Sequence, residues 1–273
     1  MWEIFVAAIL GLVEGMTEFA PVSSTGHMIV VDDLLLQSKQ LFSPDVANTF
    51  KVVIQLGSIL AVVIVFKERF RQLLGLEKDG TEETRGSHLK LSQVVVGLLP
   101  AAILGFLFED YIDEHLFSVE TVAVGLAAGA VLMMAADWFR PGRPRVQTVD
   151  QITYKQAVWI GLFQCISLWP GFSRSGSTIS GGVLLGLSHR AASDFTFIMA
   201  VPIMMGASGL SLLKNWEYFS IDALPFFMAG FISAFLFALL SIRFFLKLIN
   251  RIKLVPFAVY RIVLAAFIYF VFL

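Results

Sequence analysis

The sequence predicts an all-α integral membrane protein with six transmembrane helices and two re-entrant helix hairpins, arranged as an inverted-topology repeat. Three observations lead to this fold class. Hydrophobic residues make up 57% of the 273 residues and charged residues only 15%, which is too apolar for a soluble domain of this length. Lys and Arg gather in three of the connections between apolar stretches. Two polar, Gly/Ser-rich segments match each other at an offset of 150 residues.

Six stretches are apolar and long enough to be transmembrane helices. A helix of about 18 or more apolar residues crosses roughly 30 Å of hydrocarbon. The six predicted spans are residues 49–66, 91–108, 119–139, 195–213, 224–242 and 254–273.

The connections between these spans differ in charge. Residues 67–90, 140–155 and 243–253 are rich in Lys and Arg, which predicts that they are cytoplasmic loops. Residues 109–118 contain acidic residues and no Lys or Arg, and residues 214–223 contain one Lys, so both are predicted to face outward.

Two further apolar segments, residues 2–36 and 156–190, are interrupted midway by proline, glycine and polar residues. Each reads as a helix, a break and a second helix. The predicted orientations of the six spans are consistent with one another if each segment leaves the membrane on the side from which it entered. Residues 1–273 then form one membrane domain of two inverted repeats, 1–139 and 140–273, and sites in such proteins typically lie where the broken helices meet.

The two interrupted segments share a sequence pattern. Residues 11–26 (GLVEGMTEFAPVSSTG) align without a gap on residues 161–176 (GLFQCISLWPGFSRSG), and this alignment places Glu14 opposite Gln164. Polar, irregular backbone at membrane depth must be buried in protein or line a cavity, because lipid cannot satisfy its hydrogen bonds. The pair of segments is therefore the predicted functional site.

The first segment carries acidic, hydroxyl and imidazole groups. Glu14 and Glu18 are four residues apart and share one face of a helix. Ser23, Ser24 and His27 follow directly. A carboxylate pair beside a Ser/His cluster suits a hard divalent cation and a nucleophile.

The second segment places Arg174 among hydroxyl groups at the start of a predicted helix. The guanidinium offers a bidentate fork and a helix N-terminus offers N–H donors, so this segment is typical of a phosphate-binding site.

Packing is an alternative explanation for some of these residues. Ser, Thr and Gly are common at helix contacts in membranes, so each of Thr25, Ser175 and Thr178 taken singly fits packing as well as function. The same holds for Gln55. Burying the charged types at membrane depth costs roughly 2.5 to 3.5 kcal/mol each, which favours a functional role for Glu14, Glu18, His27 and Arg174 together.

Both segments resemble the signature regions of the undecaprenyl-diphosphate phosphatase family of the bacitracin-resistance type. Residues 14–27 are similar to its ExxxE motif followed by PxSSTGH, and residues 170–178 are similar to its PGxSRSxxT motif. The likeness extends over the whole chain and includes the Gln55 segment, residues 53–58.

The resemblance implies a bacterial inner-membrane enzyme that hydrolyses undecaprenyl diphosphate to the monophosphate and phosphate. This reaction recycles the lipid carrier of peptidoglycan and envelope glycans and confers bacitracin resistance. The resemblance also implies a divalent cation, Mg²⁺ with Ca²⁺ as the alternative. It assigns metal binding and substrate positioning to Glu14 and Glu18, diphosphate binding to Arg174, the nucleophile to Ser24 and acid/base catalysis to His27. The substrate-binding residues would be Ser23, Thr25, Gln55, Ser173, Ser175 and Thr178.

Several points stay open at this stage. Ser24 or a water in its place is the nucleophile, and His27 either takes or gives the proton.

The rival function is a transporter or flippase of an anionic polyprenyl lipid, because inverted repeats with broken helices are typical of transporters. The partners expected are membrane lipids and the lipid substrate; a homo-oligomer is left open, and no basic stripe indicates nucleic acid. The site is expected to open to the periplasmic side.

Overall fold

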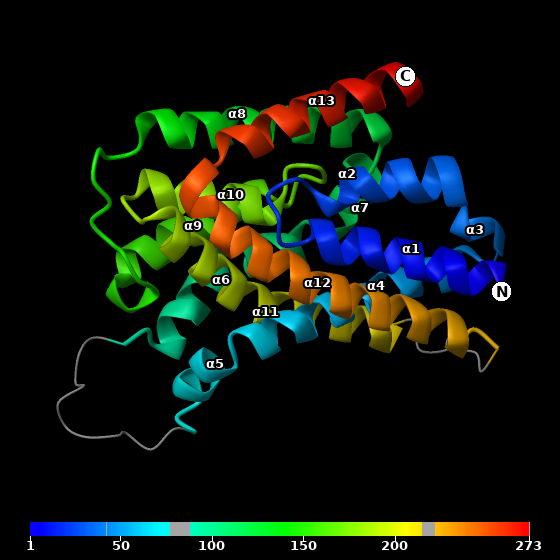
Figure 1. The fold of residues 1–273 in the computed structure, drawn as a ribbon, viewed down its shortest axis with the longest axis horizontal. Coiled ribbons are helices and arrows are strands. Elements are labelled where there is room, and N and C mark those ends of the chain that lie inside the picture. Colours follow the sequence, from blue (N-terminus) through cyan, green and yellow to red (C-terminus); the bar gives the residue numbers. More distant parts are fainter. Residues whose placement is uncertain (42, 77–87, 215–221, 273) are drawn as a thin grey trace.

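The structure is a computed structural model, and it describes residues 1–41, 43–76, 88–214 and 222–272 (Figure 1). All regular elements in these ranges are helices, and Val146 and Leu187 form an isolated β-bridge. The all-α class predicted from the sequence is confirmed for the described residues.

The first half of the chain contains a broken helix followed by longer helices. Its elements are α1 (Trp2–Thr17), α2 (Ser24–Met28) continued by a π-helical segment (Ile29–Leu36), α3 (Ser38–Leu41), α4 (Pro44–Val65), α5 (Lys67–Leu73), α6 (Leu91–Leu107), α7 (Glu109–His115) and α8 (Val119–Phe139).

The second half begins with a short 3₁₀ turn and a second broken helix. Its elements are the turn Val149–Gln151, α9 (Tyr154–Ile166), α10 (Arg174–Leu184), α11 (His189–Lys214), α12 (Leu224–Ile252) and α13 (Val255–Phe272).

Five described helices are long and apolar enough to cross a membrane by length and composition, and they lie in α4, α8, α11, α12 and α13. The sixth predicted span corresponds to α6, which is apolar but 17 residues long. The helices are those of a multi-pass membrane protein. The number of spans and the re-entrant path of the two hairpins stay predictions.

The predicted loop 243–253 is wrong, because α12 continues as helix to Ile252. Arg243, Lys247 and Arg251 are spaced four residues apart and exposed, while Phe245 and Ile249 on the other face are buried. This amphipathic pattern, built from good helix formers, extends the helix beyond its apolar part. Short helices also lie within two of the other predicted loops, namely α5 within 67–90 and α7 within 109–118.

The helix, break and helix pattern is confirmed in both hairpins. The breaks lie between α1 and α2 and between α9 and α10. Ser23 and Ser173 precede the second helix of each pair with positive φ values of 71° and 70°, a region that is uncommon for residues other than glycine. Their hydroxyls accept hydrogen bonds from the N–H groups of Gly26 and Gly176, which caps each helix. The two matched segments thus share the backbone geometry of this helix cap.

Each broken helix packs mainly against the other half of the chain. α1 packs on α12, and α9 packs on α6 (Figure 1). A Cβ at Gly11 in α1 would collide with the carbonyl oxygen of Gly230, and one at Gly161 in α9 would collide with that of Gly97. The matched glycines of the repeat therefore allow two corresponding backbone contacts.

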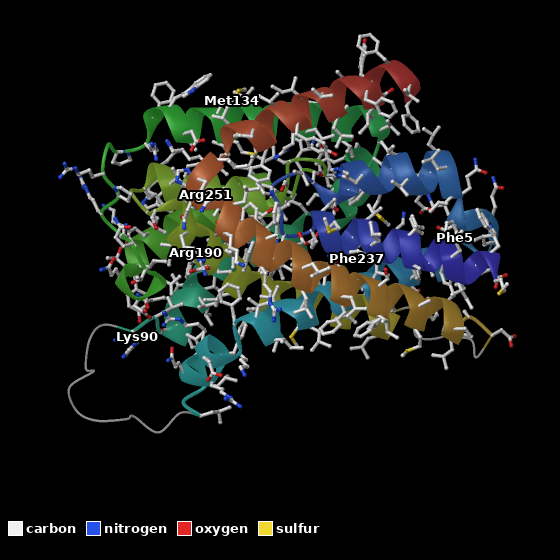
Figure 2. All side chains as sticks on the ribbon, in the orientation of Figure 1. Phe5, Lys90, Met134, Arg190, Phe237 and Arg251 are labelled. Atoms are coloured by element: carbon white, nitrogen blue, oxygen red, sulfur yellow. The ribbon has the colours of Figure 1, made fainter. Side chains whose placement is uncertain are left out.

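The remaining helices enclose α10. It packs against α8, α9 and α11, while α8 and α13 lie side by side along one face (Figure 1). Lys90, Arg190 and Arg251 lie toward one end of the molecule and Phe5 toward the other (Figure 2). The two breaks lie between these ends, inside the bundle.

Candidate active site

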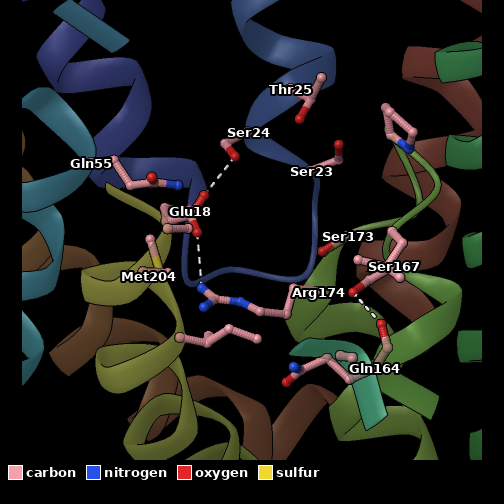
Figure 3. A pocket seen from close by; sticks show the side chains of 16 residues that line it. Glu18, Ser23, Ser24, Thr25, Gln55, Gln164, Ser167, Ser173, Arg174 and Met204 are labelled. Atoms are coloured by element: carbon pink, nitrogen blue, oxygen red, sulfur yellow. Dashed lines mark hydrogen bonds and ion pairs between the residues drawn. The ribbon is translucent and has the colours of Figure 1, made fainter. Parts of the chain in front are cut away.

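A cavity of about 290 Å³ lies between the two breaks (Figure 3). Both hairpins contribute polar side chains to its wall, and α4 contributes Gln55. Seven of the residues predicted from the sequence line it, namely Glu18, Ser23, Ser24, Thr25, Gln55, Ser173 and Arg174. The two matched segments therefore form one polar site.

Glu18 links the two hairpins. Its Oε1 pairs with Arg174 Nη2 at 2.9 Å, and its Oε2 accepts a hydrogen bond from Ser24 Oγ at 2.6 Å (Figure 3). Nη1 of Arg174 is buried and has no hydrogen-bond partner. One carboxylate thus holds a hydroxyl of the first hairpin and the guanidinium of the second, and the guanidinium keeps one donor unused.

A second cavity of about 470 Å³ adjoins the first. The two share Glu18, Ser24, Thr25 and Gln55 in their walls. The second cavity adds Glu14, Asn48 and Lys51, among others. The Lys51 ammonium lies 3.6 Å from the buried Asp32 carboxylate. The shared wall places the Ser24 hydroxyl at the boundary of both spaces.

His27 lies outside both cavities. Its Nδ1 is 2.7 Å from the Ser23 carbonyl oxygen and its Nε2 is 2.6 Å from the Tyr260 hydroxyl of α13. The two rings are stacked with centroids 5.6 Å apart. Although His27 is three residues from Ser24, the structure directs its imidazole toward α13, away from the Ser24 hydroxyl.

Ser175 and Thr178 lie behind the cavity wall. Ser175 Oγ donates to the Ala20 carbonyl oxygen at 3.1 Å, and Thr178 Oγ1 donates to the Arg174 carbonyl oxygen at 2.8 Å. Ser177 donates to the Phe163 carbonyl oxygen. The Ser175 hydroxyl thus joins the two hairpins and the Ser177 hydroxyl joins the two helices of the second hairpin, whereas the Thr178 bond lies within α10.

Three site residues were not predicted from the sequence. Gln164 and Ser167 line the first cavity. Arg261, fully buried in α13, donates from Nη2 to the carbonyl oxygens of Gly171 and Gly125 at 2.9 and 3.2 Å. The repeat alignment contained a signal for Gln164, because it lies opposite Glu14. Arg261 is a charged residue within the predicted span 254–273. Because burying charge in a membrane is costly, its position could also have indicated a role in the site.

The acidic residues fit a divalent cation. Glu14 is buried, and among the described residues no hydrogen bond or ion pair engages its carboxylate. Buried carboxylates are normally paired or bound to metal. Mg²⁺ is usually held by one or two carboxylates together with substrate phosphates and water. Among the described residues no group of three His, Cys, Asp or Glu could hold a metal ion, so Glu14 and Glu18 fit a cation that a phosphate ligand helps to bind.

The fold and the site define a multi-pass helical membrane protein with a buried polar cavity suited to a phosphorylated ligand. Residues 7–267 match the family model described as "Bacitracin resistance protein BacA", and the chain belongs to this family.

Curated relatives agree with this assignment. The chain is 73% identical over 270 residues to "Undecaprenyl-diphosphatase" of Geobacillus sp. (strain WCH70), covering 99% of this chain and 98% of the relative. It is 68% identical over 265 residues to the protein of the same name from Bacillus subtilis (strain 168), covering 97% and 96%. It is 69% identical over 274 residues to "Undecaprenyl-diphosphatase 2" of Bacillus licheniformis, covering 100% and 99%.

Proposed function

We propose that this chain is an undecaprenyl-diphosphatase, which hydrolyses undecaprenyl diphosphate to undecaprenyl phosphate and phosphate. One observation carries the proposal beyond the names of the relatives. Glu18 holds the Ser24 hydroxyl and the Arg174 guanidinium together in a buried cavity. A nucleophile, a base and a phosphate-binding cation are the parts that phosphoryl transfer requires.

Arg174 is the proposed diphosphate-binding residue. Its Nη1 is buried without a partner, and a planar guanidinium suits phosphate oxygens. Binding a phosphoryl oxygen would satisfy this donor. The same donor would stabilise negative charge that develops on the phosphoryl oxygens in the transition state.

Ser24 is the proposed nucleophile, and Glu18 is its proposed base. The Ser24 Oγ would form a bond to the terminal phosphorus while the bond from that phosphorus to the bridging oxygen breaks and undecaprenyl phosphate leaves. The hydroxyl proton would pass to Glu18 Oε2, which is 2.6 Å away and within reach of a general base. Water would then hydrolyse the phosphoserine and release phosphate. Direct attack by a water held by Glu18 is the alternative path.

Glu14 and Glu18 are the proposed ligands of a divalent cation, Mg²⁺ or Ca²⁺. When bound, the cation would offset the charge of the diphosphate. The protein side of this site is the buried Glu14 carboxylate, which faces the second cavity together with Glu18 and the side chain of Gln55.

The helices that surround the site suit a lipid substrate. Many large apolar side chains of α8, α12 and α13 are exposed on the outside of the bundle, among them Val131, Phe244 and Phe270. The polyprenyl tail would lie against such surfaces while the diphosphate enters the polar cavity. We place the enzyme in the bacterial inner membrane with the site open to the periplasm, where it would recycle the lipid carrier of cell-wall synthesis and confer bacitracin resistance.

A transporter or flippase of an anionic polyprenyl lipid is the second candidate. The corresponding contacts of α1 with α12 and of α9 with α6 favour it, because inverted repeats with broken helices are common in transporters. Anion binding alone would need only the Arg174 side of the cavity. The hydrogen bond from Ser24 to Glu18 exceeds that need and favours hydrolysis.

Phosphate release by the purified protein tests the proposal. We expect Mg²⁺-dependent release from undecaprenyl diphosphate that is lost in Arg174→Ala and Glu18→Ala and retained in Arg71→Ala, whose side chain is exposed on α5. Glu14→Gln should raise the Mg²⁺ concentration needed for half-maximal activity. Lipid movement across vesicles without phosphate release would instead support the carrier, and full activity of Arg174→Ala would contradict the assigned site.

A further inference from the structure

The wall of the 290 Å³ cavity contains two buried hydrogen-bond donors without partners. One is Nη1 of Arg174 and the other is Nε2 of Gln164. Gln164 is 2% exposed, so bulk water does not reach most of its side chain. Buried donors are normally satisfied, and a ligand that binds in the cavity would supply an acceptor for a donor on a residue of its wall.

Three other buried polar atoms among the described residues also lack partners, those of Ser58, Ser180 and Arg261 Nε. None of these residues lines either of the two cavities. Arg174 and Gln164 therefore differ from the rest, because both residues line one common cavity.

The repeat explains why an amide stands at this position. Gln164 in α9 corresponds to Glu14 in α1, and Glu14 lines the second cavity whereas Gln164 lines the first. An ionised carboxylate only accepts hydrogen bonds, whereas an amide NH₂ donates two. The same structural position thus supplies an acceptor to one cavity and a donor to the other.

Charge separates the two cavities further. In the first cavity the Arg174 guanidinium is paired with Glu18. A carboxylate at position 164 would add a further negative charge beside the place where the phosphate must bind, and like charges in a buried site repel strongly. A neutral amide avoids this repulsion and adds a donor.

The position of Gln164 is fixed by its surroundings. It lies in the last turn of α9, next to the close contact of Gly161 with α6. Its backbone carbonyl oxygen accepts hydrogen bonds from Ser167 N at 2.9 Å and from Ser167 Oγ at 2.6 Å. Figure 3 shows its side chain on the same side of the cavity as Arg174. The backbone from which the Gln164 side chain projects is therefore fixed by contacts within the protein.

We propose that Gln164 is a substrate-binding residue that makes the first cavity specific for an anion. Its Nε2 donates a hydrogen bond to a non-bridging oxygen of the diphosphate, beside the oxygen bound by Arg174. The same contact holds the inorganic phosphate product. This inference rests on the proposed function, because it names a further residue of the same site.

Two substitutions of Gln164 test the inference by steady-state kinetics with undecaprenyl diphosphate and by product inhibition with inorganic phosphate. Gln164→Leu replaces the amide with an apolar side chain of similar size and so removes the donor. We expect KM and the inhibition constant for phosphate to rise together by about tenfold, the scale of one hydrogen bond to a charged group. Gln164→Glu keeps the shape but adds charge, and we expect a fall in kcat/KM of at least about 100-fold with a larger loss of phosphate inhibition.

Thermal unfolding without substrate separates binding from a structural role. Removing a buried donor that has no partner should leave the melting temperature of Gln164→Leu unchanged or raised. Gln93→Leu is the matched control, because the buried Gln93 amide donates to the Ile152 carbonyl oxygen at 2.5 Å. We expect this control to melt at a lower temperature with an unchanged KM.

The outcomes distinguish the inference from the proposed function. If the wild-type protein releases no phosphate, the proposed function fails. If it does, and Gln164→Leu and Gln164→Glu both keep the wild-type KM and phosphate inhibition, only the role of Gln164 is overturned. A lowered melting temperature in Gln164→Leu with an unchanged KM would assign it to packing instead.

Discussion

At the scale of single residues, the Ser24 hydroxyl contacts Glu18 rather than His27. Glu18 accepts the Ser24 hydroxyl hydrogen bond at 2.6 Å. The His27 imidazole is engaged by Ser23 and Tyr260. A group that takes the proton of a nucleophile must lie within hydrogen-bond reach of it, and Glu18 meets this condition in the structure. The contact of His27 with Tyr260 joins α2 to α13.

Comparing two substitutions tests whether Glu18 or His27 acts as the base. Glu18→Gln keeps the shape of the side chain but removes the base and the charge partner of Arg174, so we expect phosphate release to fall by about 10²- to 10⁴-fold. His27→Gln should cost much less activity and instead lower the melting temperature, because it removes the hydrogen bond to Tyr260, about 1 kcal/mol. Initial rates and thermal unfolding of both variants provide the measurement.

Tyr260→Phe is the control for the histidine. It removes the same hydrogen bond from the other partner, so its melting temperature should fall by as much as that of His27→Gln, with little loss of rate. A loss of rate in His27→Gln as large as that in Glu18→Gln, with Tyr260→Phe fully active, would return the acid/base role to His27.

The residue chemistry of the site was predictable where charge and hydroxyl groups interrupt an apolar sequence. Glu18, Ser24 and Arg174 were found in this way, and the structure brings them together. The direction of a side chain was not predictable, so the sequence could not show that the Ser175 and Thr178 hydroxyls bond to backbone carbonyl oxygens behind the wall. Sequence spacing places residues on one face of a helix but does not say which neighbouring helix covers that face.

At the scale of elements, the two breaks are held in register by close backbone contacts. Gly161 of α9 lies against the carbonyl oxygen of Gly97 in α6, and Gly11 of α1 lies against that of Gly230 in α12. Small residues let membrane helices approach closely enough for extensive van der Waals contact. Because Gln164 and Glu14 lie one turn from these glycines, the contacts also position the cavity walls.

A larger side chain at one contact should separate the helices. We expect Gly161→Ile to destabilise the protein by at least about 1 to 3 kcal/mol, because the added atoms meet backbone that cannot move independently. The activity should fall with it, since α9 carries Gln164. Gly206→Ile in α11 is the matched control, because a Cβ at Gly206 would meet no atom within 4 Å apart from its own stretch of helix. Equal melting temperatures for the two variants would contradict this role of the contact.

The elements were predictable to different degrees. Proline, glycine and polar residues located both breaks, because they interrupt long apolar runs. The end of α12 was missed, because a length of apolar sequence marks a membrane crossing rather than the end of a helix, and α12 continues on an amphipathic pattern to Ile252. The same reason applies to α5 and α7, which carry charged residues and lie in segments predicted as loops.

At the scale of the whole molecule, basic residues gather at one end. Lys90, Arg190 and Arg251 lie toward this end, and α5 extends from it, whereas α3 lies near the N-terminus at the other end (Figures 1 and 2). Because Lys and Arg in short loops are retained in the cytoplasm, the molecule should sit with α5 inside and α3 outside. Lys39 of α3 lines the cavity that contains Glu14, Glu18 and Ser24. Because the Lys39 side chain is half-exposed, we expect this cavity to open on the side on which Lys39 lies.

Cysteine labelling tests orientation and access together. Cys165 is the chain's single cysteine, so Cys165→Ser gives a background into which Lys39→Cys or Lys67→Cys can be introduced; the two lysine side chains are 51% and 65% exposed. In spheroplasts, a membrane-impermeant maleimide should label the variant at position 39 at once and the variant at position 67 only after lysis. Substrate should slow labelling at position 39, because a diphosphate bound in the cavity that this residue lines would restrict access of the maleimide. It should leave position 67 unaffected. Labelling at position 67 in intact spheroplasts, with position 39 protected until lysis, would invert the molecule and place the opening of this cavity on the cytoplasmic side.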